Sequence, residues 1–597
     1  MQHLATLNKY FVKYAGHFLL GIVFVSASNY FRVLQPQLIR EALDFVIENV
    51  TLYRLYDGFA VQAEFFSRLG RILLLFGGLV LVFALLMGLF MYFMRQTIIV
   101  MSRLIEYDMR KEIFGHYQKL DTAFYKRNNT GDLMSRITED VSKVRMYLGP
   151  AVLYSINLIS LFIFVIYSMV KVSPTLTFYS LAPLPILAIS IYYVSRLINK
   201  RSTKIQEQLA ALNSTAQESY SGIRVIKSYV QEKFTGDFFA SESEDYKQKA
   251  LRLARVDALF YPVMIILIGA STIITVYVGG LQVVSGQITA GNIAEFVIYV
   301  QMLTWPATAI GWVTSVIQQA AASQKRINEF LHQEPSIVSP TADTEDESPL
   351  RGEIEFSEVE FVYPDTGIQA LKNVSFHLQA GQKMAVIGRT GSGKTTIADL
   401  LLRMYDVTSG SIRVDGTDIR RRNLHHLRRR VGYVPQDVFL YSDTIANNVA
   451  FGEKEAIQSE IEKYTTYASV HDDITELSEG YHTLVGERGV TLSGGQKQRV
   501  SIARALIKEP DIVILDDSLS AVDTKTEKRI LSYLDTTLAD KTAIIITHRV
   551  YSLLNFDKII VLEDGVISAE GTHRQLLEQG GYYAELYEMQ SLEEEAG

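Results

Sequence analysis

The chain has 597 residues, 48% of them hydrophobic, and a formal net charge of −7 at pH 7. This length is too great for a single hydrophobic core, so we expect several domains. The absence of cysteine excludes structural disulfides, thiolate catalysis, Cys-ligated zinc and iron–sulfur clusters. Charges of both signs are mixed, and the arginine clusters at 420–422 and 428–430 are expected on a solvated or interdomain helical face. Nucleic acid is therefore not expected as a partner.

Long apolar stretches are confined to the chain before about residue 325. Six of them reach the roughly 20 residues that a helix needs to span a bilayer. They lie near 17–40, 71–94, 150–170, 175–195, 257–279 and 292–318. The first follows Lys9 and Lys13 and contains VSAS at 25–28, so a cleaved signal peptide is the alternative interpretation. Because five more stretches follow, the sequence favours six membrane spans.

Lysine and arginine are concentrated in two of the segments between spans. Residues 103–145 and 200–255 are rich in both, whereas spans three and four are joined with only Lys171, and GLQVVSGQITAGN at 280–292 has no charge. The positive-inside rule therefore predicts a multi-pass protein of the cytoplasmic (inner) membrane with both termini in the cytoplasm. We expect the basic segments to be cytoplasmic helical extensions. Each is broken at a glycine, in 128–136 and 218–228, by a short transverse helix or a plain loop.

Few polar features interrupt the spans. Arg95 and Glu295 lie near predicted span ends, where we expect their side chains to snorkel to the interface rather than bind a substrate. LTWPATAIGW at 303–312 combines Pro306 with two tryptophans. We expect a kinked helix there, with aromatic side chains that lie at the interface, face the lumen or contact apolar cargo.

The composition changes after the last span. Residues 1–330 are expected to form the membrane domain, and the acidic, proline-bearing segment 331–351 a linker. Strand-like and helix-like patterns then alternate through 352–597, as in an α/β domain. The predicted fold is an α-helical six-span transmembrane domain with long cytoplasmic helical extensions, fused to an α/β domain.

MAVIGRTGSGKTTIADLL at 384–401 predicts a buried strand, a glycine-rich turn and the start of a helix. Its glycines and its Gly-Lys-Thr ending match the phosphate-binding loop, in which backbone N–H groups close around phosphate oxygens. Lys394 is expected to reach the β- and γ-phosphates, and Thr395 to offer its hydroxyl to magnesium. The residues expected to bind nucleotide here are Gly388, Arg389, Thr390, Gly391, Ser392, Gly393, Lys394, Thr395 and Thr396.

Two further strands are predicted to end at chemically active side chains. DIVILDD at 511–517 reads as a buried parallel strand that places Asp516 at its carboxyl end, where ligands bind in such sheets. Asp516 is the expected partner of Mg²⁺. AIIIT at 543–547 predicts a second strand that ends at His548, for which we expect a γ-phosphate contact rather than a purely structural role.

TLSGGQKQRVSIARAL at 491–506, just before the strand that ends at Asp516, resembles the signature motif of ATP-binding cassette (ABC) proteins. Six spans in front of one cassette are similar to the half-transporters of the type IV exporter class. The resemblance implies a P-loop ATP-binding cassette, with ATP and Mg²⁺ as cofactors. It also implies that two such chains pair and that each ATP lies between the phosphate loop of one cassette and the signature of the other. A single chain then contains no complete ATP site.

The resemblance also implies roles for individual residues. Tyr363 matches the aromatic that stacks on adenine, and Gln436 matches the glutamine that touches magnesium. LVGERG at 484–489 resembles the segment that engages the coupling helices of the membrane domain, which would be the two glycine-bearing breaks. The signature that contacts the partner's ATP matches Leu492, Ser493, Gly494, Gly495 and Gln496. The loop that communicates between the two sites matches Ser520, Ala521, Val522 and Asp523, with valine in place of the commoner leucine.

Asp517 occupies the position where the family usually has a glutamate as general base. Aspartate is one methylene shorter, which draws the carboxylate back by about 1 Å and can cost on the order of 10²-fold in rate. Asp517 and His548 are thus the expected catalytic residues of a slow site. An aspartate here with an intact signature resembles the first member of heterodimeric exporters, so a heterodimer is favoured over a homodimer.

The expected function is ATP-driven export of amphipathic or hydrophobic compounds, either drugs or lipids, by alternating access. Its expected partners are a second half-transporter, a small amphipathic substrate and membrane lipid. A homodimeric lipid flippase of the same family is one alternative. An ATP-gated channel or regulatory membrane protein is another, although no ring of charged residues is evident among the spans.

Overall fold

A computed structural model of the protein describes residues 2–340, 350–453, 455–486, 492–520, 522–537, 540–550 and 556–596. The chain forms two compact units. One consists of Met1–Tyr117 and Gly131–His332, and the other of Gln118–Thr130 and Gln333–Gly597. The chain therefore enters the second unit briefly, returns to the first, and enters the second again.

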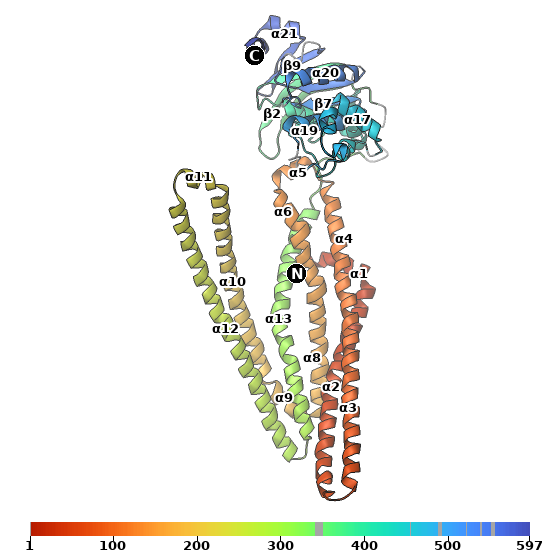
Figure 1. The fold of residues 1–597 in the computed structure, drawn as a ribbon, viewed down its shortest axis with the longest axis vertical. Coiled ribbons are helices and arrows are strands. Elements are labelled where there is room, and N and C mark those ends of the chain that lie inside the picture. Colours follow the sequence, from red (N-terminus) through yellow and green to blue (C-terminus); the bar gives the residue numbers. More distant parts are fainter. Residues whose placement is uncertain are drawn as a thin grey trace. The chain divides into compact units, whose positions relative to one another are not determined.

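The first unit is built from long helices, coloured from red to green in Figure 1. Among the described residues, six helical runs are long and apolar enough to cross a membrane. They are Ala15–Leu55, Val61–Tyr117, Thr130–Val172, Pro174–Ser221, Glu232–Val284 and Ala290–Leu331. Each predicted span lies inside one of these runs, so the prediction of six spans is confirmed.

Some of these runs contain more than one helical element. The helices are η1 (Gln2–Leu7), α1 (Asn8–Lys13), α2 (Ala15–Leu55), α3 (Val61–Met94), α4 (Val100–Tyr117), α6 (Thr130–Ser135), α7 (Val141–Met146), α8 (Val152–Val172), α9 (Pro174–Leu181), α10 (Pro183–Ser221), α11 (Ile223–Ser228), α12 (Glu232–Val284) and α13 (Ala290–Leu331). Three wider π-helical turns interrupt them: η2 (Arg95–Ile99), η3 (Arg136–Asp140) and η4 (Tyr147–Ala151). Helix α3 packs along α2, and α12 packs along α10 (Figure 1).

Glu295 is buried inside the first unit. Its side chain is 1% exposed, and its Oε2 lies 3.3 Å from Nη1 of Arg40 on α2. Tyr299 Oη donates a hydrogen bond to its Oε1 at 3.0 Å. The expectation that Glu295 snorkels to the interface is wrong, because a basic partner 255 residues away in the sequence compensates its charge within the helix bundle.

The two glycine-bearing breaks behave differently. The second contains the short helix α11, as one of the two alternatives anticipated. In the first, α6 begins a run that continues to Val172, and the separate short helix α5 (Thr122–Arg127) comes earlier. Asp121 sets its start, because the Asp121 carboxylate accepts a hydrogen bond from the Phe124 N–H at 2.9 Å. The placement of a transverse helix in 128–136 was therefore wrong.

The second unit contains two sheets. A four-stranded antiparallel sheet has the order β2-β1-β4-β5, and a six-stranded sheet has the order β10-β9-β3-β8-β7-β6, parallel except for β10. The strands are β1 (Ile354–Val362), β2 (Gln369–Leu378), β3 (Lys383–Gly388), β4 (Ser409–Val414), β5 (Thr417–Asp418), β6 (Val431–Val434), β7 (Ile512–Asp516), β8 (Thr542–Ile546), β9 (Lys558–Glu563) and β10 (Val566–Gly571). The predicted α/β character of this region is confirmed.

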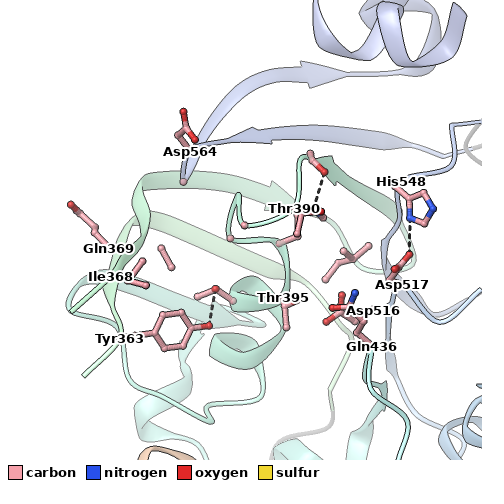
Figure 2. A pocket seen from close by; sticks show the side chains of 18 of the residues that line it. Tyr363, Ile368, Gln369, Thr390, Thr395, Gln436, Asp516, Asp517, His548 and Asp564 are labelled. Carbon is pink, nitrogen blue, oxygen red and sulfur yellow. Dashed lines mark hydrogen bonds and ion pairs between the residues drawn. The ribbon is translucent and has the colours of Figure 1, made fainter. Parts of the chain in front are cut away.

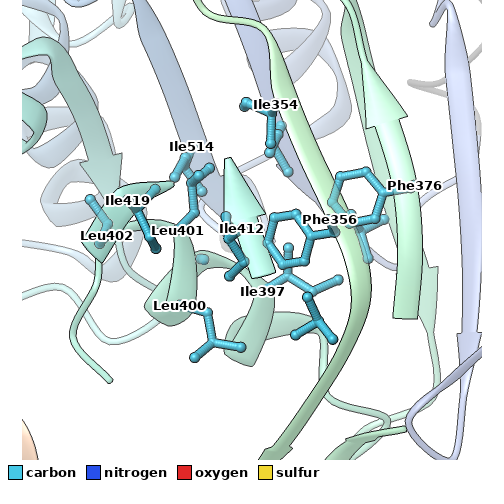
Figure 3. Packing of buried hydrophobic residues seen from close by; sticks show 14 of the residues in the cluster. Ile354, Phe356, Phe376, Ile397, Leu400, Leu401, Leu402, Ile412, Ile419 and Ile514 are labelled. Atoms are coloured by element: carbon cyan, nitrogen blue, oxygen red, sulfur yellow. The ribbon is translucent and has the colours of Figure 1, made fainter. Parts of the chain in front are cut away.

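Helices cover these sheets and complete the unit. They are α14 (Lys394–Leu401), η6 (Ile419–Arg421), α15 (Leu424–Arg430), α16 (Ile445–Ala450), α17 (Gln458–Tyr467), α18 (His471–Thr475), η7 (Gly480–His482), α19 (Gly494–Leu506), α20 (Thr524–Thr537), α21 (His573–Gln579) and α22 (Tyr582–Ala596). Apolar residues of α14 fill the space between the two sheets, where Ile397 and Leu401 pack near the stacked rings of Phe356 and Phe376 (Figure 3). This packing fixes α14, and with it the loop that precedes α14.

Arg420, Arg421 and Arg429 of the arginine clusters are exposed, as expected for a solvated face, whereas Arg422 and Arg428 lie against the protein. Arg422 is 1% exposed, and its Nη2 donates to the Val414 carbonyl oxygen at 2.9 Å. Arg428 Nη2 donates to the carbonyl oxygen of Arg403 at 2.8 Å. The expectation of a solvated face is wrong for Arg422, because the Val414 carbonyl oxygen, which the sequence pattern does not reveal, accepts hydrogen bonds from its Nε and Nη2.

Candidate functional site

The loop between β3 and α14 has a backbone that only glycine fits at two points. A Cβ atom on Gly388 would lie 2.1 Å from the Leu562 carbonyl oxygen. Gly393 has φ +100° and precedes the first residue of α14, and a Cβ there would meet the Ala370 carbonyl oxygen at 2.5 Å. Glycine at both points lets the loop turn tightly at the start of α14, where backbone N–H groups and the helix N-terminus favour an anion.

Lys394 lies at the start of α14 and reaches back over the loop. Its Nζ donates to the carbonyl oxygens of Gly388 and Arg389, each at 2.8 Å. Burial lowers the pKa of its ammonium group, while the nearby carboxylates of Asp517 and Asp516 raise it. The cation is therefore held between the loop and two acidic side chains, where a phosphate group would be its natural counter-ion.

Asp516 ends β7 as predicted and is 1% exposed. Burial raises the pKa of its carboxyl group, and a hydrogen bond from Thr395 lowers it. Its Oδ2 and the Oγ of Ser392 are buried atoms for which no described residue provides a hydrogen-bond partner. Such orphaned oxygen atoms suit a hard cation and the phosphate it carries, because Mg²⁺ takes few protein ligands and keeps phosphate oxygens and waters.

The Asp517 carboxylate contacts His548, which follows β8. His548 Nδ1 lies 3.0 Å from Asp517 Oδ1, and this hydrogen bond raises the pKa of the imidazole. The Asp517 backbone has φ +46°, a left-handed conformation that aspartate tolerates better than most residues. The two expected catalytic residues therefore lie together at the edge of the sheet (Figure 2).

These groups line one pocket of about 650 Å³. Tyr363 lies at the opposite end from His548 (Figure 2), and its hydroxyl and that of Thr396 are 2.9 Å apart. Gln436 also lines the pocket. The pocket brings together these residues with Gly388, Thr390, Gly391, Gly393, Lys394, Thr395, Asp516 and Asp517.

A residue that sequence reasoning missed lies beside this pocket. Lys126 of α5 places its Nζ 4.8 Å from the ring centre of Tyr363 and 5.4 Å from that of Tyr405. Ala123, also of α5, is 5% exposed and belongs to the same apolar cluster as the strands of the second unit. Nothing local in the sequence signals this contact, since α5 precedes Tyr363 by more than two hundred residues.

The signature residues form the start of another helix, α19. Ser493 Oγ accepts a hydrogen bond from the Gln496 N–H at 3.2 Å, and Gln496 Oε1 accepts one from the Ser493 N–H at 3.0 Å. This reciprocal cap fixes the first turn, which contains Gly494 and Gly495. Leu492 is 6% exposed. Among the described residues, none of Leu492–Gln496 lines the pocket.

The expected communication loop follows Asp517 directly. Ser520 Oγ donates to the Asp517 carbonyl oxygen at 2.8 Å, and Arg549 Nη1 donates to that of Val522 at 3.1 Å. Asp523 Oδ1 accepts from the Thr526 N–H at 2.9 Å. The loop is thus tied both to the Asp517 backbone and to the segment after His548. Ala521, Glu487–Gly489 of LVGERG and Thr491 lie outside the described residues.

A six-span helical unit joined to a P-loop sheet unit defines a membrane transporter that carries its own ATPase. Residues 18–307 match the family described as ABC transporter transmembrane region, and residues 371–520 match the family described as ABC transporter. Together with relatives of 31–38% identity, these matches show that the chain belongs to the ABC transporters. It is a multi-pass membrane protein and an ATPase coupled to transport, and exporters of this family work as dimers.

Three relatives illustrate the range of the similarity. The chain is 37% identical over 590 residues to the probable multidrug resistance ABC transporter ATP-binding/permease protein YheI of Bacillus subtilis, covering 99% of this chain and 98% of the relative. It is 38% identical to the multidrug resistance-like ATP-binding protein MdlA of Escherichia coli, covering 88% of each chain. It is 34% identical to the ATP-dependent lipid A-core flippase of Syntrophus aciditrophicus, covering 85% and 84%.

Proposed function

We propose that this chain is one half of a dimeric exporter that uses ATP to move amphipathic drugs or lipids out of the cytoplasm. The names of its relatives, multidrug resistance proteins and a lipid A-core flippase, support this substrate range. The basic segments 103–145 and 200–255 support a cytoplasmic position for the second unit and for both termini. The observation that carries the proposal is the pocket that joins the phosphate loop to Asp516, Asp517 and His548.

Several groups of the pocket have a role in ATP binding. The ring of Tyr363 stacks on the adenine, and the loop N–H groups bind the phosphates. Lys394 exchanges its two carbonyl acceptors for oxygens of the β- and γ-phosphates. Thr395 and Asp516, with Gln436 nearby, would hold Mg²⁺, which would supply positive charge against the phosphates.

Asp517 is the general base for the attacking water, and its carboxylate is held by His548. Hydrolysis needs this carboxylate at hydrogen-bond distance from the water. Because aspartate is about 1 Å shorter than glutamate, and misplacement of that size can cost about 10²-fold in rate, we expect this chain's own site to hold ATP longer than it hydrolyses it.

The signature supports pairing with a different chain. Ser493, Gly494 and Gly495 lie on α19, outside the pocket of their own chain. They are available to complete the site of a partner, and that partner must supply the signature that this chain's pocket lacks. A partner with glutamate at the base position would hydrolyse ATP at the normal rate. In a heterodimer, the intact signature of this chain would complete that active site, while Asp517 keeps the chain's own site slow. A homodimeric lipid flippase is the second candidate, supported by the similarity to the lipid A-core flippase.

The test is to isolate the tagged chain from its native membranes, identify any second half-transporter by mass spectrometry, and reconstitute chain and pair separately in proteoliposomes. We expect the pair to hydrolyse ATP and accumulate an amphipathic dye against its gradient, and the single chain to hydrolyse slowly. Brisk hydrolysis by the single chain would contradict the slow site. Passive ionic conductance without uphill movement would contradict export.

A further inference from the structure

The first unit encloses a second cavity, of about 750 Å³, between α2, α3, α8 and α13. Most of its wall is apolar: Met87, Met91 and Met94 line it from α3, and Tyr154 and Trp305 line it from α8 and α13. The rings of Tyr154 and Trp305 are 5.6 Å apart. Methionine and aromatic side chains adapt to apolar bodies of different shape, and the volume suits a drug-sized ligand.

Two of the three π-helical turns contribute to the wall. Arg95, Gln96 and Ile99 of η2 line the cavity, as does Pro150 of η4. A π-helical turn widens a helix locally and turns side chains away from their regular positions, and such turns are frequent at functional sites. The helices here depart from regular geometry at the cavity itself.

Two arginines face this apolar space without a counter-charge. Arg32 of α2 and Arg95 line the cavity, and none of its lining residues is acidic. Within the described residues, neither guanidinium forms a hydrogen bond or an ion pair. Three neutral polar residues of the wall, by contrast, are paired: Asn29 Nδ2 donates to Asn157 Oδ1 at 3.0 Å, and Ser28 Oγ donates to the Met87 carbonyl oxygen at 3.2 Å.

Arg40 lies two turns further along α2 and is 25% exposed. It pairs with Glu295. Arg32 is half-buried and has no such carboxylate, although an ionised side chain within a membrane helix is costly unless it is paired or wet. A planar guanidinium fork is suited to carboxylate, sulfonate and phosphate groups.

We propose that this cavity is a binding site for an amphipathic anion, with the apolar body against the methionines and the two rings and the acid group against Arg32. Arg95, which is exposed, adds a second positive charge that attracts the acid group toward the cavity. The inference rests on the proposed export function and narrows its substrate class to compounds with an acid group. A small organic anion and an anionic phospholipid share this chemistry.

The first experiment compares two dyes with the same apolar body. 1-Anilinonaphthalene-8-sulfonate carries an acid group, and N-phenyl-1-naphthylamine does not. Binding of each to the purified full chain in phosphatidylcholine nanodiscs is followed by dye fluorescence without ATP. We expect the sulfonate to bind at least tenfold more tightly. Arg32→Gln should abolish most of this preference and leave the affinity of the uncharged dye within about twofold.

Two further variants sharpen the result. Arg32→Lys keeps the charge but not the fork, and should retain part of the preference. Arg71→Gln on α3 removes an arginine that does not line the cavity and should change nothing. The Arg71 Nε donates to the Ser67 carbonyl oxygen at 3.4 Å. An unchanged ratio of the two affinities in Arg32→Gln, or an equal loss in Arg71→Gln, would overturn the proposal. Size-exclusion profiles establish that each variant is folded.

Replacing part of the phosphatidylcholine by phosphatidylglycerol separates the two sources of the anion. If phosphatidylglycerol weakens binding of the sulfonate dye to the parent chain but not to Arg32→Gln, the ligand is an anionic lipid. If phosphatidylglycerol leaves binding of the sulfonate dye unchanged, the ligand is a small organic anion. Because none of these measurements needs ATP, failure of the anion site leaves ATP-driven export standing, and failure of export leaves the binding data intact.

Discussion

His548 Nδ1 and Asp517 Oδ1 lie 3.0 Å apart, at the ends of the neighbouring strands β8 and β7. This contact holds the short carboxylate of Asp517 on the imidazole, at the edge of the pocket that the phosphate loop borders. His548 orients the Asp517 carboxylate but does not compensate for the methylene that aspartate lacks relative to glutamate. The shorter side chain of Asp517 is therefore expected to lower the rate of ATP hydrolysis, which can be measured.

Asp517→Glu is expected to raise the rate of ATP hydrolysis by the purified chain, on the order of ten- to a hundredfold, because the added methylene brings the carboxylate about 1 Å closer to the water. The φ of +46° costs glutamate about 1 kcal/mol more strain, so Tm should fall slightly. Asp517→Asn keeps the shape without the base and should be slower than the parent chain. Equal rates for the Glu variant and the parent would contradict the geometric explanation.

The contact between Asp517 and His548 should depend on pH. Asp517 raises the pKa of His548 above its ordinary value of 6.5. The stabilisation is therefore fully present below about pH 6.5, the unfolded pKa, and is lost as the pH rises through the higher folded value. We expect the Tm difference between the parent chain and His548→Gln to be largest near pH 6 and to shrink by pH 8.5. His3→Gln is the control, and a difference that grows with pH would contradict this assignment.

Lys394→Ala is expected to weaken ATP binding at least tenfold, because it removes a cation that reaches over the loop to Gly388 and Arg389. Titration with a fluorescent ATP analogue measures the change in Kd. Lys525→Ala, an exposed lysine of α20, is the matched control and should bind as the parent does. In the purified pair, hydrolysis at the partner's site should survive Lys394→Ala in part. Complete loss of hydrolysis would argue for equivalent sites.

Asp516→Asn should separate nucleotide binding from its dependence on magnesium. The side chain is 1% exposed, and asparagine fills the same space, so the fold should tolerate the change. The buried anionic oxygen is lost, however, and the increase in ATP affinity produced by Mg²⁺ should fall at least tenfold. Titration with and without chelator checks this result. If Mg²⁺ strengthens binding equally in both proteins, Asp516 does not contact the ion.

The Arg40–Glu295 pair should contribute unequally to stability when its two members are removed. Arg40→Gln leaves a carboxylate that is 1% exposed without its partner, whereas Glu295→Gln leaves an arginine that is 25% exposed. Breaking a buried pair costs about 3–5 kcal/mol, so we expect Arg40→Gln to lower Tm more than Glu295→Gln. The double variant should recover part of the loss. Strictly additive changes in Tm would show that the two side chains do not interact.

Features that depend on neighbouring residues could be predicted from the sequence, whereas contacts between residues far apart in the sequence could not. The six spans and the loop from Gly388 to Thr396 depend on neighbouring residues, and the structure places spans and loop where the sequence indicates. The contact of His548 with Asp517 follows from two strands that end at the same edge of one sheet. Arg40 and Glu295 are 255 residues apart, and no periodicity links them.

Local patterns also misplaced some features. The glycine in 128–136 suggested a short transverse helix or a plain loop there, but the separate short helix begins earlier, after Asp121, and Thr130 starts a long helical run. The sequence places Arg422 in a charged cluster, but in the structure its Nη2 donates to the Val414 carbonyl oxygen. Lys126 lies beside Tyr363 only because the chain returns to the second unit, which is a property of the tertiary fold alone.

The path of the chain between the two units has a mechanical consequence. Residues Gln118–Thr130 belong to the second unit although both flanks belong to the first. The polypeptide therefore crosses between the units three times, near 117, 131 and 333. A cut of the chain near 333 would sever only one crossing, and the N-terminal fragment would still carry a piece of the other unit's apolar core at Ala123. The two units are therefore joined by three chain crossings rather than by a single linker.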